Sequence, residues 1–196
     1  IDQNVKQLVA LEMSTYNNPV ASVDGWKNIH STERVRVYRK GSTIVIAVRG
    51  TNKSSAEDIA DDVAIVKGTL NRSPRFLELK SIYEAVTNQY PNDKVVVIGH
   101  SLGGAMVIEL SQYFRNINGV IFNPAVNMSN LRSNKYNLKN IQAHIMEHDP
   151  FVLTSSFLPN ATKYKYPYIL RGDASDHIKA HELKSFLGRG KRKTKK

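Results

Sequence analysis

Residues 95–110 read VVVIGHSLGGAMVIEL, in which one serine stands between two apolar runs. Gly99 lies two residues before Ser101, and Gly103 lies two residues after it. The first run is continuously apolar and β-branched, which is typical of a strand buried on both faces, and residues 102–114 follow as a predicted helix. Strand, tight turn and helix in this order indicate a G-x-S-x-G nucleophile elbow, whose strained turn lifts the serine hydroxyl out of the backbone. We expect a side chain larger than hydrogen at Gly99 or Gly103 to collide with the neighbouring strand or helix.

Hydrophobic periodicity predicts the other elements. The helix over 73–90 has Ser73 as its cap, Pro74 at its first position and a buried stripe formed by Phe76, Leu79, Ile82 and Val86. The remaining predictions are a helix over 2–18, a hairpin over 33–50, strands over 119–123 and 140–146, an edge strand over 164–170 and a helix over 177–187. Strands that alternate with helices indicate an α/β fold with a mainly parallel sheet covered on both faces.

Composition limits the classes of protein that fit. The 196 residues predict one domain over 1–188, and the absence of cysteine excludes disulfides, thiolate metal sites and a cysteine nucleophile. The sequence contains no stretch of eighteen or more apolar residues, so no membrane span is predicted. The formal net charge is +11, and six of the eight residues in RGKRKTKK, 189–196, are basic. We expect a disordered tail there. Its role is either to keep the protein in solution or to make peripheral contact with an anionic membrane or a polyanion such as nucleic acid. The sequence does not decide between a nuclear, a secreted or another location.

A serine nucleophile needs a base and an orienting acid, and in this fold the acid and then the base follow the serine in the chain. Asp149 follows the predicted strand over 140–146 and precedes a proline, with Glu147 as the weaker candidate acid. His177 and His181 are the candidate bases, and their i, i+4 spacing does not choose between them. An oxyanion hole needs two backbone donors. Leu102 follows the serine, and the Arg49-Gly50-Thr51 loop follows a predicted strand.

Several segments together resemble the class 3 (fungal-type) triacylglycerol lipases of the α/β-hydrolase superfamily, over about residues 5 to 187. They are IVIAVRGT, EDIADDV, VVVIGHSLGGAM, VIFNPAV, EHDPFVL and AHELKSFL. The resemblance implies an α/β-hydrolase fold with a catalytic triad of Ser101, Asp149 and His181, and the AHELKSFL match favours His181 over His177. It also implies an oxyanion hole formed by Thr51 and Leu102, with Asp62 supporting the oxyanion residue and Asp61 as the alternative.

The function expected from this resemblance is a serine carboxylester hydrolase, a lipase or phospholipase that cleaves glycerolipid esters through an acyl-enzyme. No metal and no organic cofactor is needed for that chemistry. Residues 64–72, AIVKGTLNR, are all that is available for a lid, which is short for the family. The alternative function is a lipase-like module without activity that binds membranes or nucleic acid through its basic surface. A third interpretation is an acyltransferase, in which the same acyl-enzyme forms but an alcohol, and not water, accepts the acyl group.

Overall fold

A single eight-stranded sheet forms the centre of the computed structural model, which describes residues 3–51, 69–126, 135–152, 158–168, 170, 172 and 174–188. The strands lie in the order of the chain. Their bounds are β1 Ser22–Val23, β2 Trp26–Ser31, β3 Val35–Lys40, β4 Thr43–Val48, β5 Lys94–His100, β6 Asn118–Phe122, β7 Ile141–Met146 and β8 Ala161–Tyr164.

The sheet has an antiparallel part and a parallel part. β1 to β4 pair antiparallel, and the predicted hairpin is the β3–β4 pair. β4 to β8 pair parallel, so each connection between them must cross back over the sheet. Helices α3, Pro74–Gln89, and α4, Leu102–Leu110, lie in the first two crossings. The expected α/β class with a mainly parallel sheet is therefore confirmed, and β5 lies in the middle of the sheet.

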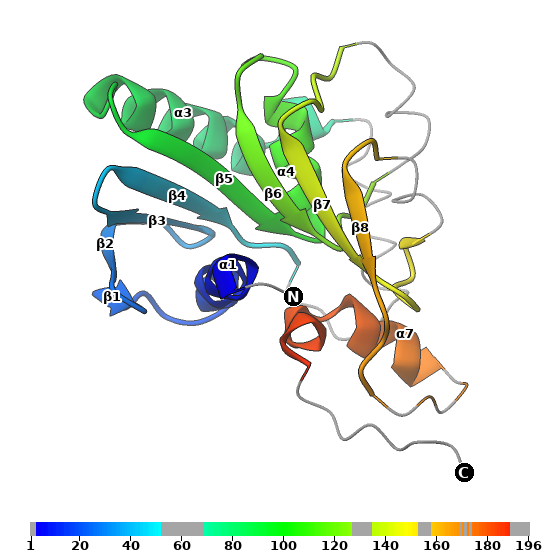
Figure 1. The fold of residues 1–196 in the computed structure, drawn as a ribbon. Coiled ribbons are helices and arrows are strands. Elements are labelled where there is room, and N and C mark those ends of the chain that lie inside the picture. The colour runs from blue at the N-terminus through cyan, green and yellow to red at the C-terminus, as the bar shows by residue number, and fades with distance from the viewer. Residues whose placement is uncertain are drawn as a thin grey trace.

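Both faces of the sheet are covered, as Figure 1 shows. On one face α3 and α4 pack against β4 and β5, with Phe76, Leu79 and Met106 in the core. On the other face lie α1, Gln3–Ser14, α7, Ala174–His181, and the 3₁₀ helix η2, Leu183–Leu187. Val9 of α1 and Phe186 of η2 share one buried cluster, so segments from the two ends of the described chain cover the same face.

Several sequence predictions differ in detail from the structure. The helix predicted over 2–18 ends at Ser14. The helix over 102–114 ends at Leu110, and the C-terminal helix is interrupted at Glu182, whose backbone is extended with ψ 142°. The edge strand predicted over 164–170 is misplaced, because β8 ends at Tyr164. Pro167 lacks an amide donor, and the residue before it is restricted as well, so the paired segment lies ahead of them. In α3 the buried stripe includes Tyr83, whereas Ile82 is only partly buried.

Among the described residues, no helix has the length and apolar character that crossing a membrane requires. The basic tail over 189–196 lies outside the described residues, as do residues 64–68 of the candidate lid. Of the other lid residues, Leu70–Arg72 form a short 3₁₀ helix, η1, directly before α3.

We predict that Ser73→Ala lowers the free energy of unfolding by about 1 kcal/mol, because it removes the helix cap. The Ser73 hydroxyl accepts the backbone N–H of Phe76 at 3.2 Å, as the sequence led us to expect. The check is chemical denaturation of wild type and variant, with Ser73→Asp as the matched control that restores the acceptor. An equal loss of stability in both variants would show that the cap itself is not the cause.

Candidate active site

Ser101 lies in a sharp turn between the carboxyl end of β5 and the first residue of α4. Its backbone has φ 57° and ψ −121°, a left-handed conformation that is rare for a residue other than glycine. A Cβ at Gly99 would lie 2.4 Å from the carbonyl carbon and oxygen of Gly103, and one at Gly103 would lie 2.2 Å from the carbonyl oxygen of Val48. The expected collision is confirmed, so both glycines are required by close backbone approach.

The side chains of Ser101, His181 and Asp149 form one hydrogen-bonded row. His181 Nε2 lies 2.8 Å from Ser101 Oγ, and His181 Nδ1 lies 2.5 Å from Asp149 Oδ1. All three residues are buried, and the second carboxylate oxygen of Asp149 accepts the amide of Phe151 at 3.2 Å. A carboxylate only accepts, so Nδ1 carries the proton and Nε2 is left to accept the serine hydroxyl. Burial raises the pKa of Asp149, and the hydrogen bond from His181 opposes that rise.

The other candidate acid and base point elsewhere. His177 is exposed and its Nδ1–H donates to the carbonyl oxygen of His148 at 2.6 Å. Glu147 accepts the amide of Tyr166 at 2.7 Å, beyond the end of β8. The structure therefore brings His181 and Asp149 into the hydrogen-bonded row with Ser101. It brings neither of the alternatives, His177 and Glu147, into that row.

Asn123 holds the end of the helix that carries His181. Its side-chain Nδ2 donates to the carbonyl oxygen of Ala180 at 2.8 Å and to that of His181 at 3.3 Å. Its Oδ1 accepts the amide of Met146 at 2.8 Å. The last carbonyls of α7 have no partner within the helix, so this amide side chain helps to satisfy them and ties them to β7. The sequence did not identify Asn123 as a residue of the site, and predicted it only as the last residue of a strand.

A second hydrogen-bonded chain joins Gly50 to His181. The amide of Gly50 donates to Tyr16 Oη at 3.2 Å, Tyr16 Oη lies 2.7 Å from His100 Nδ1, and His100 Nε2 lies 2.5 Å from the carbonyl oxygen of His181. Because a carbonyl only accepts, Nε2 of His100 carries the proton, and the Tyr16 hydroxyl must then donate to Nδ1. Burial, and next the neighbouring His181, lower the pKa of His100 to about 3, which keeps this ring neutral.

A buried carboxyl supports the elbow from the side of α1. Glu12 is fully buried, and its Oε1 accepts the amide of His100 at 3.2 Å. Burial raises the pKa of Glu12 well above its ordinary value. Glu12 and Tyr16 follow Val9 at helical spacing, so polar groups continue the buried stripe of α1. A carboxyl on an apolar stripe was the sequence signal that could have identified this support.

The expected oxyanion residues lie on either side of the elbow. Leu102 is the first residue of α4, where backbone N–H groups lack partners within the helix. The Gly50–Thr51 loop is close to the serine, since a Cβ at Gly50 would lie 3.1 Å from Ser101 Cβ. The Thr51 hydroxyl oxygen is buried and forms no hydrogen bond to the described residues. Asp62 and Asp61, the candidate supports of Thr51, lie outside the described residues.

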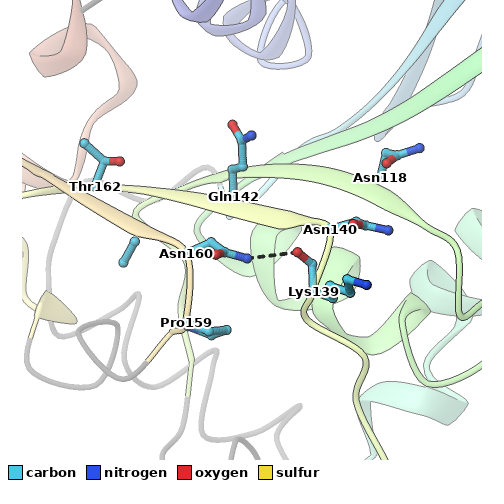
Figure 2. A pocket seen from close by; sticks show the side chains of 8 residues that line it. Asn118, Lys139, Asn140, Gln142, Pro159, Asn160 and Thr162 are labelled. Carbon is cyan, nitrogen blue, oxygen red and sulfur yellow. Dashed lines mark hydrogen bonds between the residues drawn. The ribbon is translucent and has the colours of Figure 1, made fainter.

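A polar cavity of about 580 Å³ lies at the other end of the parallel strands, where β6, β7 and β8 begin (Figure 2). Its lining includes Asn118, Asn140, Gln142 and Asn160, and the Asn160 amide donates to the carbonyl oxygen of Lys139 at 3.0 Å. Ser101 follows the carboxyl end of β5, so this cavity is separate from the candidate active site. In the part of the chain that the structure describes, no group of three or more His, Cys, Asp or Glu side chains could hold a metal ion.

Solved structures of fungal lipases share this fold. The Rhizomucor miehei triacylglyceride lipase has a TM-score of 0.55 and 20% identity, with 85% of this chain and 81% of that one covered. The Lip2 lipase from Yarrowia lipolytica has a TM-score of 0.52 and 16% identity, with coverages of 86% and 82%. Lipase II from Rhizopus niveus has a TM-score of 0.52 and 18% identity, with coverages of 80% and 76%. At these identities the likeness concerns the fold alone, and the expected α/β-hydrolase fold is confirmed.

A search of curated protein sequences found no match. A family model matches residues 52–155, which include β5, the elbow, α4 and Asp149. Its description is "Uncharacterised protein family (UPF0227)". The resemblance to class 3 lipases therefore holds for the fold, and the chain belongs to family UPF0227.

Proposed function

We propose that this protein is a serine carboxylester hydrolase that cleaves acyl esters of glycerolipids. The observation that carries the proposal is the row of hydrogen bonds from Ser101 through His181 to Asp149, at the end of a central strand. The fold shared with a triacylglyceride lipase and other fungal lipases supports a lipid ester as substrate.

The geometry suits acyl transfer in two steps. Ser101 Oγ attacks the ester carbonyl while His181 Nε2 takes its proton, and Asp149 stabilises the imidazolium that forms. The backbone N–H groups of Leu102 and Thr51 hold the oxyanion, and each such donor contributes about 10²–10³ in turnover. His181 returns the proton to the leaving alcohol, and then activates the water that releases the fatty acid. The protein needs no metal ion for these steps.

The alternative of an inactive binding module has less support. A module without activity has no need for a buried serine, imidazole and carboxylate held in one row, and burying such groups costs stability. The test of the proposed function is a panel of triacylglycerol, monoacylglycerol and phospholipid substrates with the purified protein. Release of fatty acid from at least one of them, together with labelling of Ser101 by a fluorophosphonate probe, is the expected result.

We predict that Ser101→Ala abolishes ester hydrolysis and fluorophosphonate labelling. Alanine removes the nucleophile and fits the turn, so we expect the free energy of unfolding to stay within about 1 kcal/mol of wild type. Titration of fatty acid release and thermal melting check the two parts. Hydrolysis by the variant at the wild-type rate would remove Ser101 from the mechanism.

We predict that His181→Ala lowers turnover by several orders of magnitude, because the serine then has no base. His177→Ala is the matched control, and it should cost less than tenfold, or under about 1.4 kcal/mol in the activation barrier. The measurement is kcat on a soluble short-chain ester, with thermal melting of both variants to verify folding. A larger loss in His177→Ala would make His177 the base.

We predict that Asp149→Asn lowers kcat by about 10⁴, as the corresponding change does in a serine protease, with a small effect on KM. An amide in place of the carboxylate favours the imidazole tautomer that cannot accept the serine proton. Glu147→Gln is the control for loss of a neighbouring negative charge, and it should change kcat less than tenfold. The opposite ranking of these two variants would reassign the acid to Glu147.

A further inference from the structure

Three arginine side chains gather beside the loop that leads from β4 to Thr51. Arg34 and Arg49 are joined across the ends of β3 and β4 by a backbone hydrogen bond of 2.8 Å. Arg75, in the first turn of α3, donates from Nη2 to the carbonyl oxygen of Arg49 at 2.5 Å. Burial, and next the charges of Arg34 and Arg49, lower the pKa of Arg75 to about 10. Three guanidinium groups therefore share a small region, which we call the arginine cluster.

The charge of the arginine cluster is poorly compensated within the described residues. Among these residues the cluster forms one ion pair, in which Arg49 Nη2 lies 3.7 Å from Glu33 Oε1. The Glu33 side chain is 80% exposed. The Nε atoms of Arg34, Arg49 and Arg75, like that of Arg36, are buried and have no hydrogen-bond partner among the described residues. Glu78 also acts electrostatically on Arg75, so two carboxylates face three guanidinium groups in this part of the structure. Partly buried like charges that are incompletely balanced destabilise the folded chain, and a bound anion would reduce that cost.

Arg36 is near the cluster but has a different role. Its guanidinium donates to the carbonyl oxygens of Thr32, Val35 and Asn17, which ties the start of β3 to the end of α1. These three bonds engage both Nη atoms of Arg36 inside the protein. Arg34, Arg49 and Arg75 form fewer such bonds within the described residues, so they are the members of this region with most charge to offer a ligand.

The arginine cluster lies next to the candidate reaction centre. Arg49 precedes Gly50, where an added Cβ would lie 3.1 Å from Ser101 Cβ. Tyr16, Glu33, Arg36 and Arg49 line a cavity of about 640 Å³ that gives Arg49 access to solvent. The arginine cluster therefore adjoins, through the backbone of Arg49, the loop that approaches Ser101.

We propose that Arg34, Arg49 and Arg75 bind the phosphate group of a phosphorylated ester substrate, such as a phospholipid head group, while its acyl ester reaches Ser101. The proposal rests on the ester hydrolase function proposed above and selects phosphorylated over neutral glycerolipids. Planar guanidinium groups match the oxygens of a phosphate in paired hydrogen bonds, which explains arginine at all three positions. A neutral acylglycerol adds no negative charge to the cluster.

The test compares two substrates that differ only in the phosphate: dioctanoylphosphatidic acid and dioctanoylglycerol, each in neutral detergent micelles. We expect the ratio of their kcat/KM values to favour the phosphorylated ester at least tenfold in wild type. Arg49→Gln should lower that ratio at least tenfold, and Glu33→Gln should raise it, because it removes the competing carboxylate. Arg39→Gln is the matched control, since Arg39 pairs with Asp93 at 2.8 Å at the far end of β3, and its ratio should equal that of wild type.

A second measurement tests binding without turnover. Inorganic phosphate should raise the Tm of wild type above its value in chloride of equal ionic strength, and Arg49→Gln should lose this increase. If phosphate raises the Tm but the phosphorylated ester is not preferred, the site takes free phosphate and the head-group assignment is wrong.

The remaining outcomes separate the two proposals. Cleavage of both esters with a ratio that Arg49→Gln leaves unchanged overturns the arginine proposal and leaves the hydrolase function intact. The same holds if phosphate has no effect on Tm, as expected if carboxylates of this chain, such as those within residues 57–62, already neutralise the cluster. Cleavage of neither ester overturns the hydrolase function and, with it, the head-group assignment.

Discussion

The close contact between the end of β4, the end of β5 and the start of α4 determines the geometry of the whole candidate site. Gly99 and Gly103 approach each other and Val48 too closely for any side chain, and this holds Ser101 in a left-handed backbone conformation. Such strain costs of order 1–3 kcal/mol and persists where surrounding structure compensates for it. Here the compensation comes from apolar helices on both faces of the sheet, which bury β5 in the middle of the molecule.

Hydrogen bonds from distant parts of the chain then place His181, the candidate base, beside Ser101. Asn123 at the end of β6 and His100 at the end of β5 both donate to the carbonyl oxygen of His181. Tyr16, just after α1, links His100 to the amide of Gly50 and so to the candidate oxyanion loop. These contacts depend on α1 and the C-terminal helices covering the same face of the sheet (Figure 1).

Burial keeps one histidine of this site neutral. His100 stays neutral because its pKa is lowered to about 3, so it does not compete for positive charge with the imidazolium that would form at His181. The ring centroids of these two histidines are only 5.0 Å apart, which makes that neutrality important. Burial likewise raises the pKa of Glu12, which lies under the elbow. The arginine cluster carries positive charge, and the role proposed for it is to bind an anionic group of the substrate near this site.

Local sequence was sufficient for features that depend on neighbouring residues. The elbow, the hairpin and the Ser73 cap follow from glycine spacing, alternation and a side chain that reaches its own backbone. Helical spacing could not choose between His177 and His181, since residues four apart on a helix share a face, and only the resemblance to class 3 lipases favoured His181. In the structure Asn123 and His100 hold the carbonyl end of α7, and the helix is interrupted at Glu182, which leaves His181 beside Ser101. Tyr16, Glu12 and the arginine cluster were missed for the same reason: their roles depend on contacts between segments far apart in the chain, which only the tertiary structure brings together.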